Sequence, residues 1–126
     1  MSVISVTQSE MLVEYNQMLN VLSEGFDYLE NNLEDEAPPQ VQQVFVDTLN
    51  AFDQLSKIHN QMEQLLEEDG LEPLLADFSD IIRSLAKWFD QPTNDEKRDL
   101  LIKEVSPSFK SWKQRMQALI HPYVAH

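Results

Sequence analysis

A histidine and a glutamate four residues apart are the side chains of this sequence best placed to bind a metal ion. On a helix, His59 and Glu63 would share one face, because residues i and i+4 are neighbours there. Metal-binding helical bundles use Glu-x-x-His motifs on paired helices, and the sequence has none. One His and one Glu are too few ligands. Because His59 lies between the apolar Leu55 and Met62, we favour a buried, hydrogen-bonded histidine and keep a metal or small-ligand site as an alternative.

Most other catalytic chemistries lack their residues in this sequence. There is no cysteine, which excludes disulfides, thiol nucleophiles, thiolate zinc sites and iron–sulfur clusters. Two isolated glycines cannot build a phosphate-binding loop. The serines lie at expected helix caps or on polar faces, where nothing marks one as an activated nucleophile. We therefore expect a protein that is not an enzyme and that uses no cofactor.

An acidic run around Gly70 is the remaining candidate for ion binding. Glu67, Glu68 and Asp69 precede the glycine, and Glu72 follows it. The run lacks the alternating oxygen ligands and the closing glutamate of a calcium loop. Carboxylates at the start of a helix are favoured by the helix dipole. The sequence therefore predicts a structural role for these acids and no metal site.

The segment KSWKQRMQ, residues 110–117, is cationic in a strongly acidic chain. It carries Lys110, Lys113 and Arg115, whereas the formal net charge of the chain is −13. Residues 1–56 contain ten acids and no Lys or Arg, and residues 97–126 contain six bases and two acids, a local net of +4. This polarity along the sequence is its most informative feature.

Two interpretations of these cations follow. In the one we favour, Lys110, Lys113 and Arg115 face the acids of the first helix, because the first and last helices of an antiparallel bundle are neighbours. Such exposed pairs add only about 0–1 kcal/mol each, but they help to select which helices pack together. In the alternative, the cations and Trp112 form a docking patch for an acidic partner, since Arg and Trp are enriched in binding hot spots. Trp88 and Phe89, adjacent at the end of the third expected helix, are a separate candidate for a groove or helix face that binds a partner, although we favour their burial in the core.

The elements that position these residues are all expected to be helices. The first runs from about Thr7 to Leu33 and begins with a Thr7–Glu10 capping box. Its apolar residues are Met11, Tyr15, Met18, Leu22, Phe26, Leu29 and Leu33. Their intervals of three and four are the period of a helix with one buried face. Gly25, inside this helix, marks a bend or a close approach of another backbone.

Prolines and one glycine divide the rest of the chain. The second helix is expected over about 39–69, with Gly70 as its C-terminal cap. The third, over about 71–89, has the broadest apolar face. The last begins near Asn94 behind a Thr93–Glu96 capping box, is interrupted at Pro107 and stops at Pro122.

Together these elements predict an all-α protein. The favoured architecture is a single domain over residues 1–126, an antiparallel up-down-up-down four-helix bundle with the last helix kinked or split at Pro107. The competing architecture is a three-helix core whose last helices are swapped into a dimer.

Composition limits the possible partners. A pI near 4.4 disfavours binding to nucleic acid or anionic lipid. No run of about 18 apolar residues indicates a membrane span, and the N-terminus does not resemble a secretory signal. The expected location is cytoplasmic, as for small acidic adaptors of bacteria. We expect a non-enzymatic protein-interaction module, namely an adaptor, chaperone-like or regulatory bundle. The alternatives are a metal- or small-ligand-binding bundle using His59 and Glu63, and a structural homodimer.

Overall fold

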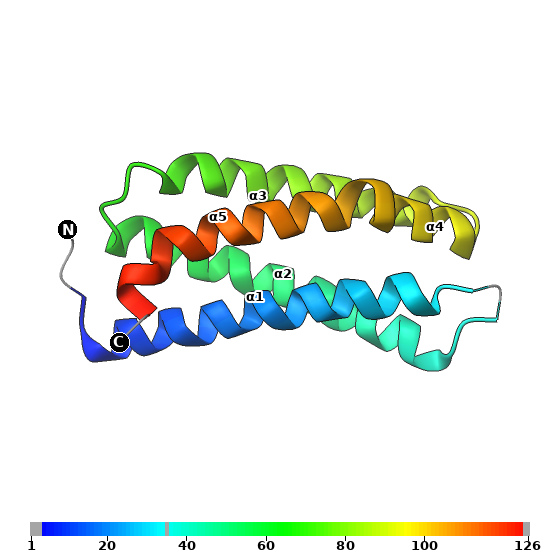
Figure 1. Cartoon of the computed structure of the whole chain (residues 1–126), viewed down its shortest axis with the longest axis horizontal. Coiled ribbons are helices and arrows are strands. Elements are labelled where there is room, and N and C mark those ends of the chain that lie inside the picture. Colours follow the sequence, from blue (N-terminus) through cyan, green and yellow to red (C-terminus); the bar gives the residue numbers. More distant parts are fainter. Residues whose placement is uncertain (1–3, 35, 125–126) are drawn as a thin grey trace.

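The computed structural model describes residues 4–34 and 36–124 and is an all-α bundle, as the sequence predicts. The described residues form no β-strand. Figure 1 shows the long helical segments lying along one axis, with the connections between them at alternating ends. The elements are α1 (Val6–Asn32), α2 (Pro39–Leu65), α3 (Leu71–Ala86), the 3-10 turn η1 (Lys87–Asp90), α4 (Asn94–Leu100), the π-helical turn η2 (Leu101–Val105) and α5 (Ser106–Val124).

The capping box of α1 lies two residues earlier than predicted. Ser5 is the N-cap: its Oγ accepts from the Gln8 amide at 3.1 Å, and the Gln8 side chain accepts from the Ser5 amide at 2.8 Å. The predicted Thr7–Glu10 box is wrong because this earlier pair already begins the helix. Thr93, in contrast, caps α4 as predicted, since its side chain accepts from the Glu96 amide at 3.1 Å.

The boundary between α2 and α3 also differs from the prediction. α2 ends at Leu65, because Leu66 adopts an extended conformation (φ −104°, ψ 129°). Gly70 is therefore not the C-terminal cap of α2. It precedes α3 with φ −80°, an ordinary conformation for any residue.

The last helical segment is interrupted directly before Pro107, as predicted, but it does not stop at Pro122. Pro107 lies in the first turn of α5, directly after η2, where the Ser106 amide donates to the Leu101 carbonyl five residues earlier. Because Pro107 has no backbone N–H to donate, the helix continues toward it through a wider π-turn. Pro122 lies inside α5 and does not end it.

Four phenylalanines, one from each long segment, meet at the centre of the bundle. The ring centroid of Phe52 of α2 lies close to the centroids of the other three rings. The distances are 6.1 Å to Phe26 of α1, 5.3 Å to Phe78 of α3 and 5.9 Å to Phe109 of α5. All four rings are buried. Burying such a side chain contributes about 1.5–3 kcal/mol, and each aromatic pair adds about 0.5–1.5 kcal/mol. This cluster holds the four segments in one core.

Gly25 lies where α1 meets α2. A Cβ built on Gly25 would lie 3.5 Å from Thr48 Oγ1 and 3.9 Å from Val44 Cγ1, which is ordinary van der Waals contact. The glycine therefore marks the approach of the two helices, although the space also admits an alanine.

None of the helices in the described part of the chain is long and apolar enough to cross a membrane.

Candidate functional site

The cations of residues 110–117 are divided between two neighbouring helices. Lys110 Nζ lies 2.6 Å from Asp27 Oδ1 of α1, as the intramolecular interpretation predicts. Arg115 Nη1 instead lies 2.8 Å from Asp77 Oδ2 of α3, because α5 packs against both α1 and α3. Lys113 forms no ion pair with any residue that the structure describes. Two of the three cations are thus occupied within the chain.

The two tryptophans predicted to dock a partner lie in the core. Trp112 is fully buried and its indole N–H donates to the Leu74 carbonyl at 2.8 Å. Trp88 is buried with its ring stacked on Phe45, at a centroid distance of 4.0 Å. Neither side chain is on the surface, so neither can be part of the predicted patch in this conformation. Their large apolar rings are worth more inside the bundle than on its surface.

His59 is a core residue paired with a tyrosine. Its Nε2 lies 2.7 Å from Tyr15 Oη, and its ring contacts the edges of Phe78 and Trp112. Burial lowers the pKa of His59 to about 4, so the imidazole is neutral at pH 7, and burial raises the pKa of Tyr15.

Glu63 does not join His59. It is exposed, whereas His59 is buried. Among the described residues no three His, Asp or Glu side chains are close enough together to hold a metal ion. The buried imidazole is directed to Tyr15, as the favoured interpretation of a buried, hydrogen-bonded histidine predicts, and Glu63 does not contribute a second ligand beside it.

Phe89 is the one residue of the predicted docking set that is largely exposed and apolar. Its side chain is 69% exposed, while its neighbour Trp88 is 5% exposed. Both belong to η1, where the helix tightens and consecutive residues turn by about 120° rather than 100°. Trp88 enters the core and Phe89 is left at the surface, where its ring centroid lies 5.8 Å from that of Phe45 in an edge-to-face arrangement.

Phe89 stands at one end of an apolar groove between α2 and α3, which we call the α2–α3 groove. The groove has a volume of about 270 Å³. Its lining residues are Leu49, Phe52, Asp53 and Ser56 of α2, and Ile82, Leu85, Ala86 and Phe89 of α3 and η1. Phe52 and Leu85 are buried, while Ile82 is 37% exposed. The lining contains a single charged side chain, the carboxylate of Asp53.

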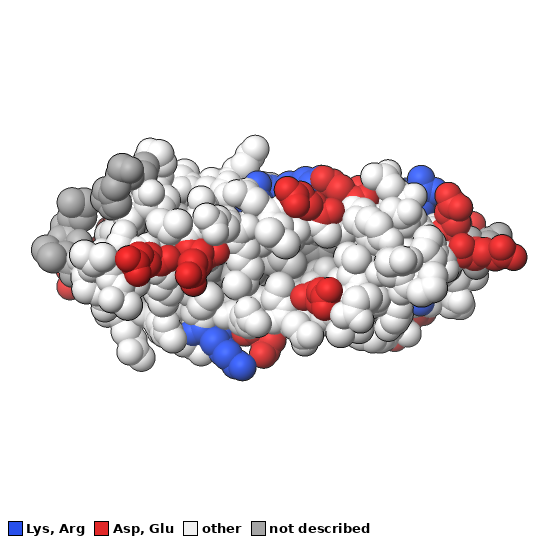
Figure 2. Space-filling view, turned by 90° about the horizontal axis from the view of Figure 1, so that it is seen from below, with Lys and Arg blue, Asp and Glu red and all other residues white. Residues whose placement is uncertain are grey.

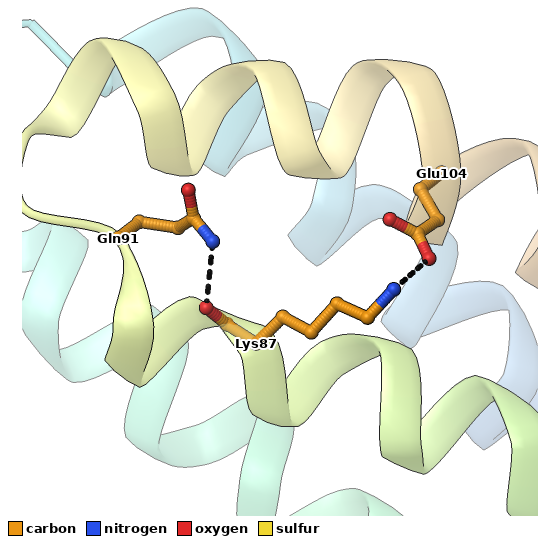
Figure 3. A network of polar contacts seen from close by, with 3 residues as sticks. All are labelled: Lys87, Gln91 and Glu104. Atoms are coloured by element: carbon orange, nitrogen blue, oxygen red, sulfur yellow. Dashed lines mark hydrogen bonds and ion pairs between the residues drawn. The ribbon is translucent and has the colours of Figure 1, made fainter.

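A polar network ties η1 to the last segment of the chain (Figure 3). Lys87 Nζ lies 2.6 Å from Glu104 Oε1, and the Gln91 side chain donates to the Lys87 carbonyl at 3.0 Å. The hydrogen bond from Lys87, with a second from Ser84, holds the pKa of Glu104 below its usual range. The network therefore connects the turn that carries Phe89 to the π-helical turn η2.

A larger but polar groove lies between α3 and α5. Its volume is about 610 Å³ and its lining includes Asp77, Arg115, Glu104 and three serines. The charged groups are already paired, Arg115 with Asp77 and Glu104 with Lys87. Because these pairs satisfy each other inside the chain, this groove has less to offer a ligand than the α2–α3 groove.

Negative charges predominate on the surface of the protein. Figure 2 shows one long face of the bundle, on which carboxylates outnumber cations and much of the area is uncharged. With 22 acids and nine bases in the chain, the field around the molecule is negative and attracts basic surfaces.

Comparison with known proteins shows the family of the chain. No curated protein and no solved structure matches it. One family model matches residues 10–115, a range that includes α2, α3, η1 and all residues of the α2–α3 groove. The chain belongs to this family, which is described as a domain of unknown function (DUF8042).

Proposed function

We propose that this protein is a non-enzymatic, cytoplasmic protein-interaction module that docks a segment of another protein in the α2–α3 groove. The observation that carries the proposal is Phe89, a large apolar side chain that is 69% exposed beside an apolar groove. Exposed apolar patches of this kind mark interaction sites in soluble proteins. Aromatic residues are also enriched in binding hot spots.

The dimensions of the groove favour a protein partner over a small molecule. At about 270 Å³ it is at or below the lower limit of pockets that enclose small ligands, which are about 300–1,000 Å³. It suits a few apolar side chains that project from a docked segment. Two of its lining residues, Phe52 and Leu85, are buried in the core, so these side chains are already packed before a partner binds.

Co-purification with matched surface variants tests the proposal. Wild type, Phe89→Ser and Val21→Ser would each be used as bait at equal amounts. Val21 is 63% exposed on α1, outside the groove, so its variant controls for loss of exposed apolar surface. We expect a protein retained by wild type and by Val21→Ser and lost from Phe89→Ser, with the same order of binding when that protein is purified.

Two results would contradict the proposal. One is a partner retained equally by all three baits, which would place its docking surface elsewhere. The other is a self-associated species, seen by light scattering and abolished by Phe89→Ser, which would make the groove a homodimer interface.

A further inference from the structure

We infer that the segment held in the α2–α3 groove is an amphipathic helix with a basic polar face. This inference rests on the proposed function and specifies the chemistry of the partner.

The shape of the groove argues for a helix. One wall is a row of apolar residues at positions 82, 86 and 89, spaced as i, i+4 and i+7. The other wall contains Leu49, Asp53 and Ser56, spaced as i, i+4 and i+7. Seven residues of helix extend about 10 Å, or two turns. A helical partner with apolar residues at the same spacing would lay one ridge between these two rows.

The apolar residues around the groove extend the contact beyond its floor. Val46 lies one turn before Leu49 on α2 and is 37% exposed, as is Ile82. With Phe89 they supply exposed apolar surface on both helices that border the groove. A docked ridge would cover these side chains and exclude water from the floor, the arrangement typical of binding hot spots.

The charge around the groove indicates that the polar face of the partner helix is basic. The single charged lining residue is Asp53, whose only ion partner in the described structure is Lys57 at 3.1 Å. These side chains are 67% and 73% exposed, respectively, so this pair is weak and can be exchanged for a cation of the partner. The net charge of −13 further attracts a basic segment.

The same charge argues against a second copy of this chain in the groove. Two copies would each bring a net charge of −13, and only three of the nine bases, Lys57, Arg83 and Lys87, belong to α2, α3 and η1. Like charges brought together at an interface oppose association. A basic helix from a different protein is the better complement.

Designed peptides test the chemistry directly. The first is a helical peptide with leucines at i, i+4 and i+7 and lysines on its other positions. The second keeps the leucines and replaces the lysines with glutamates, and the third keeps the lysines and replaces the leucines with serines. Titration calorimetry at physiological salt should show the first binding the full chain at least about tenfold more tightly than either of the others.

Variants of the protein locate the binding. Phe89→Ser should weaken the lysine–leucine peptide about tenfold, while Val21→Ser leaves it unchanged. Asp53→Lys should weaken it by about three- to fivefold. Asp47→Lys makes the same charge change on the same helix at an exposed position outside the groove lining, and should have a smaller effect.

The outcomes separate this inference from the proposed function. Tight binding of the glutamate–leucine peptide, lost in Phe89→Ser, would overturn the basic partner and leave the docking groove standing. Equal binding of the lysine–serine peptide would reduce the interaction to general charge attraction and overturn the helical ridge. Binding of none of the three would also overturn this inference, whereas the proposed function is judged by co-purification with Phe89→Ser.

Discussion

Trp88 and Phe89 are adjacent in sequence but lie in opposite environments. Trp88 is stacked on Phe45 inside the bundle, and Phe89 extends into solvent beside the α2–α3 groove. Both residues belong to the tight turn η1, which directs their side chains differently. Lys87 of the same turn forms an ion pair with Glu104. Exposing a phenylalanine forgoes about 1.5–3 kcal/mol of burial. A surface that gives up this stabilisation in the free protein is where a partner is expected to bind.

This difference predicts opposite costs for two neighbouring substitutions. Trp88→Ala should lower the free energy of unfolding by about 3–5 kcal/mol, because it leaves a cavity beside Phe45. Phe89→Ser should lower it by less than about 1 kcal/mol, since this side chain is already 69% exposed. Urea unfolding of both variants measures these values. Similar large losses in the two variants would show that Phe89 is a structural residue and not a free docking residue.

The buried histidine predicts how stability depends on pH. The pKa of His59 is about 4 in the folded protein and 6.5 when exposed, so on acidification the unfolded chain takes up its proton first. The contribution of the neutral His59 to the free energy of unfolding is fully present above pH 6.5 and is lost as the pH falls toward 4. It amounts to about 3 kcal/mol at 1.36 kcal/mol per pKa unit.

His59→Gln isolates this contribution. Urea unfolding at several pH values between 7 and 4 compares the variant with wild type, so carboxylate titrations common to both cancel. The stability of wild type should fall more steeply with decreasing pH than that of His59→Gln. Parallel pH profiles would show that His59 is protonated equally easily in the folded and unfolded chains.

Two lysines on α5 provide a matched test of the intramolecular ion pairs. Lys110 pairs with Asp27, whereas Lys113 has no ion partner among the described residues. Lys110→Glu should therefore destabilise the protein by about 1 kcal/mol more than Lys113→Glu at low salt. Thermal unfolding at low and high salt should show this difference shrinking. Equal effects of the two reversals at low salt would mean that the Lys110–Asp27 pair contributes nothing to the fold.

Gly25 predicts a stabilising substitution. It lies inside α1 with an ordinary helical φ, and an added Cβ would make van der Waals contact with Thr48 and Val44. Gly25→Ala should raise the free energy of unfolding by up to about 1 kcal/mol, because alanine restricts the unfolded chain and favours the helix. A lower midpoint in urea would show that α1 and α2 need the bare glycine to approach.

The sequence predicts the fold class because apolar residues recur at helical intervals. Most of the stripe from Met11 to Leu33 is buried, but Met11 and Met18 are only partly so, and Leu12 and Leu19 are fully buried. The ends of the helices are less predictable, because several polar residues compete to cap them. Ser5–Gln8 and Thr7–Glu10 both satisfy the capping pattern, and the structure uses the first.

The candidate site was only partly predictable. The sequence favours burial of both Trp88 and Phe89, because helical periodicity places them on one apolar face and does not detect the change of pitch at η1 that leaves Phe89 exposed. Adjacent aromatic residues are the available signal, since a helix turns by about 100° per residue and cannot bury both equally. The α2–α3 groove arises from tertiary packing, and no local pattern marks it.

The most direct test of the central claim is a site-specific crosslink from position 89. A photoreactive phenylalanine analogue would replace Phe89 in one chain and Val21 in another, and both would be irradiated in the cells that make the protein. The docking groove predicts a distinct crosslinked product with another protein from position 89, absent from position 21 and lost when Ile82→Asp is added. Identical products from both positions, or none from position 89 at full expression, would contradict it.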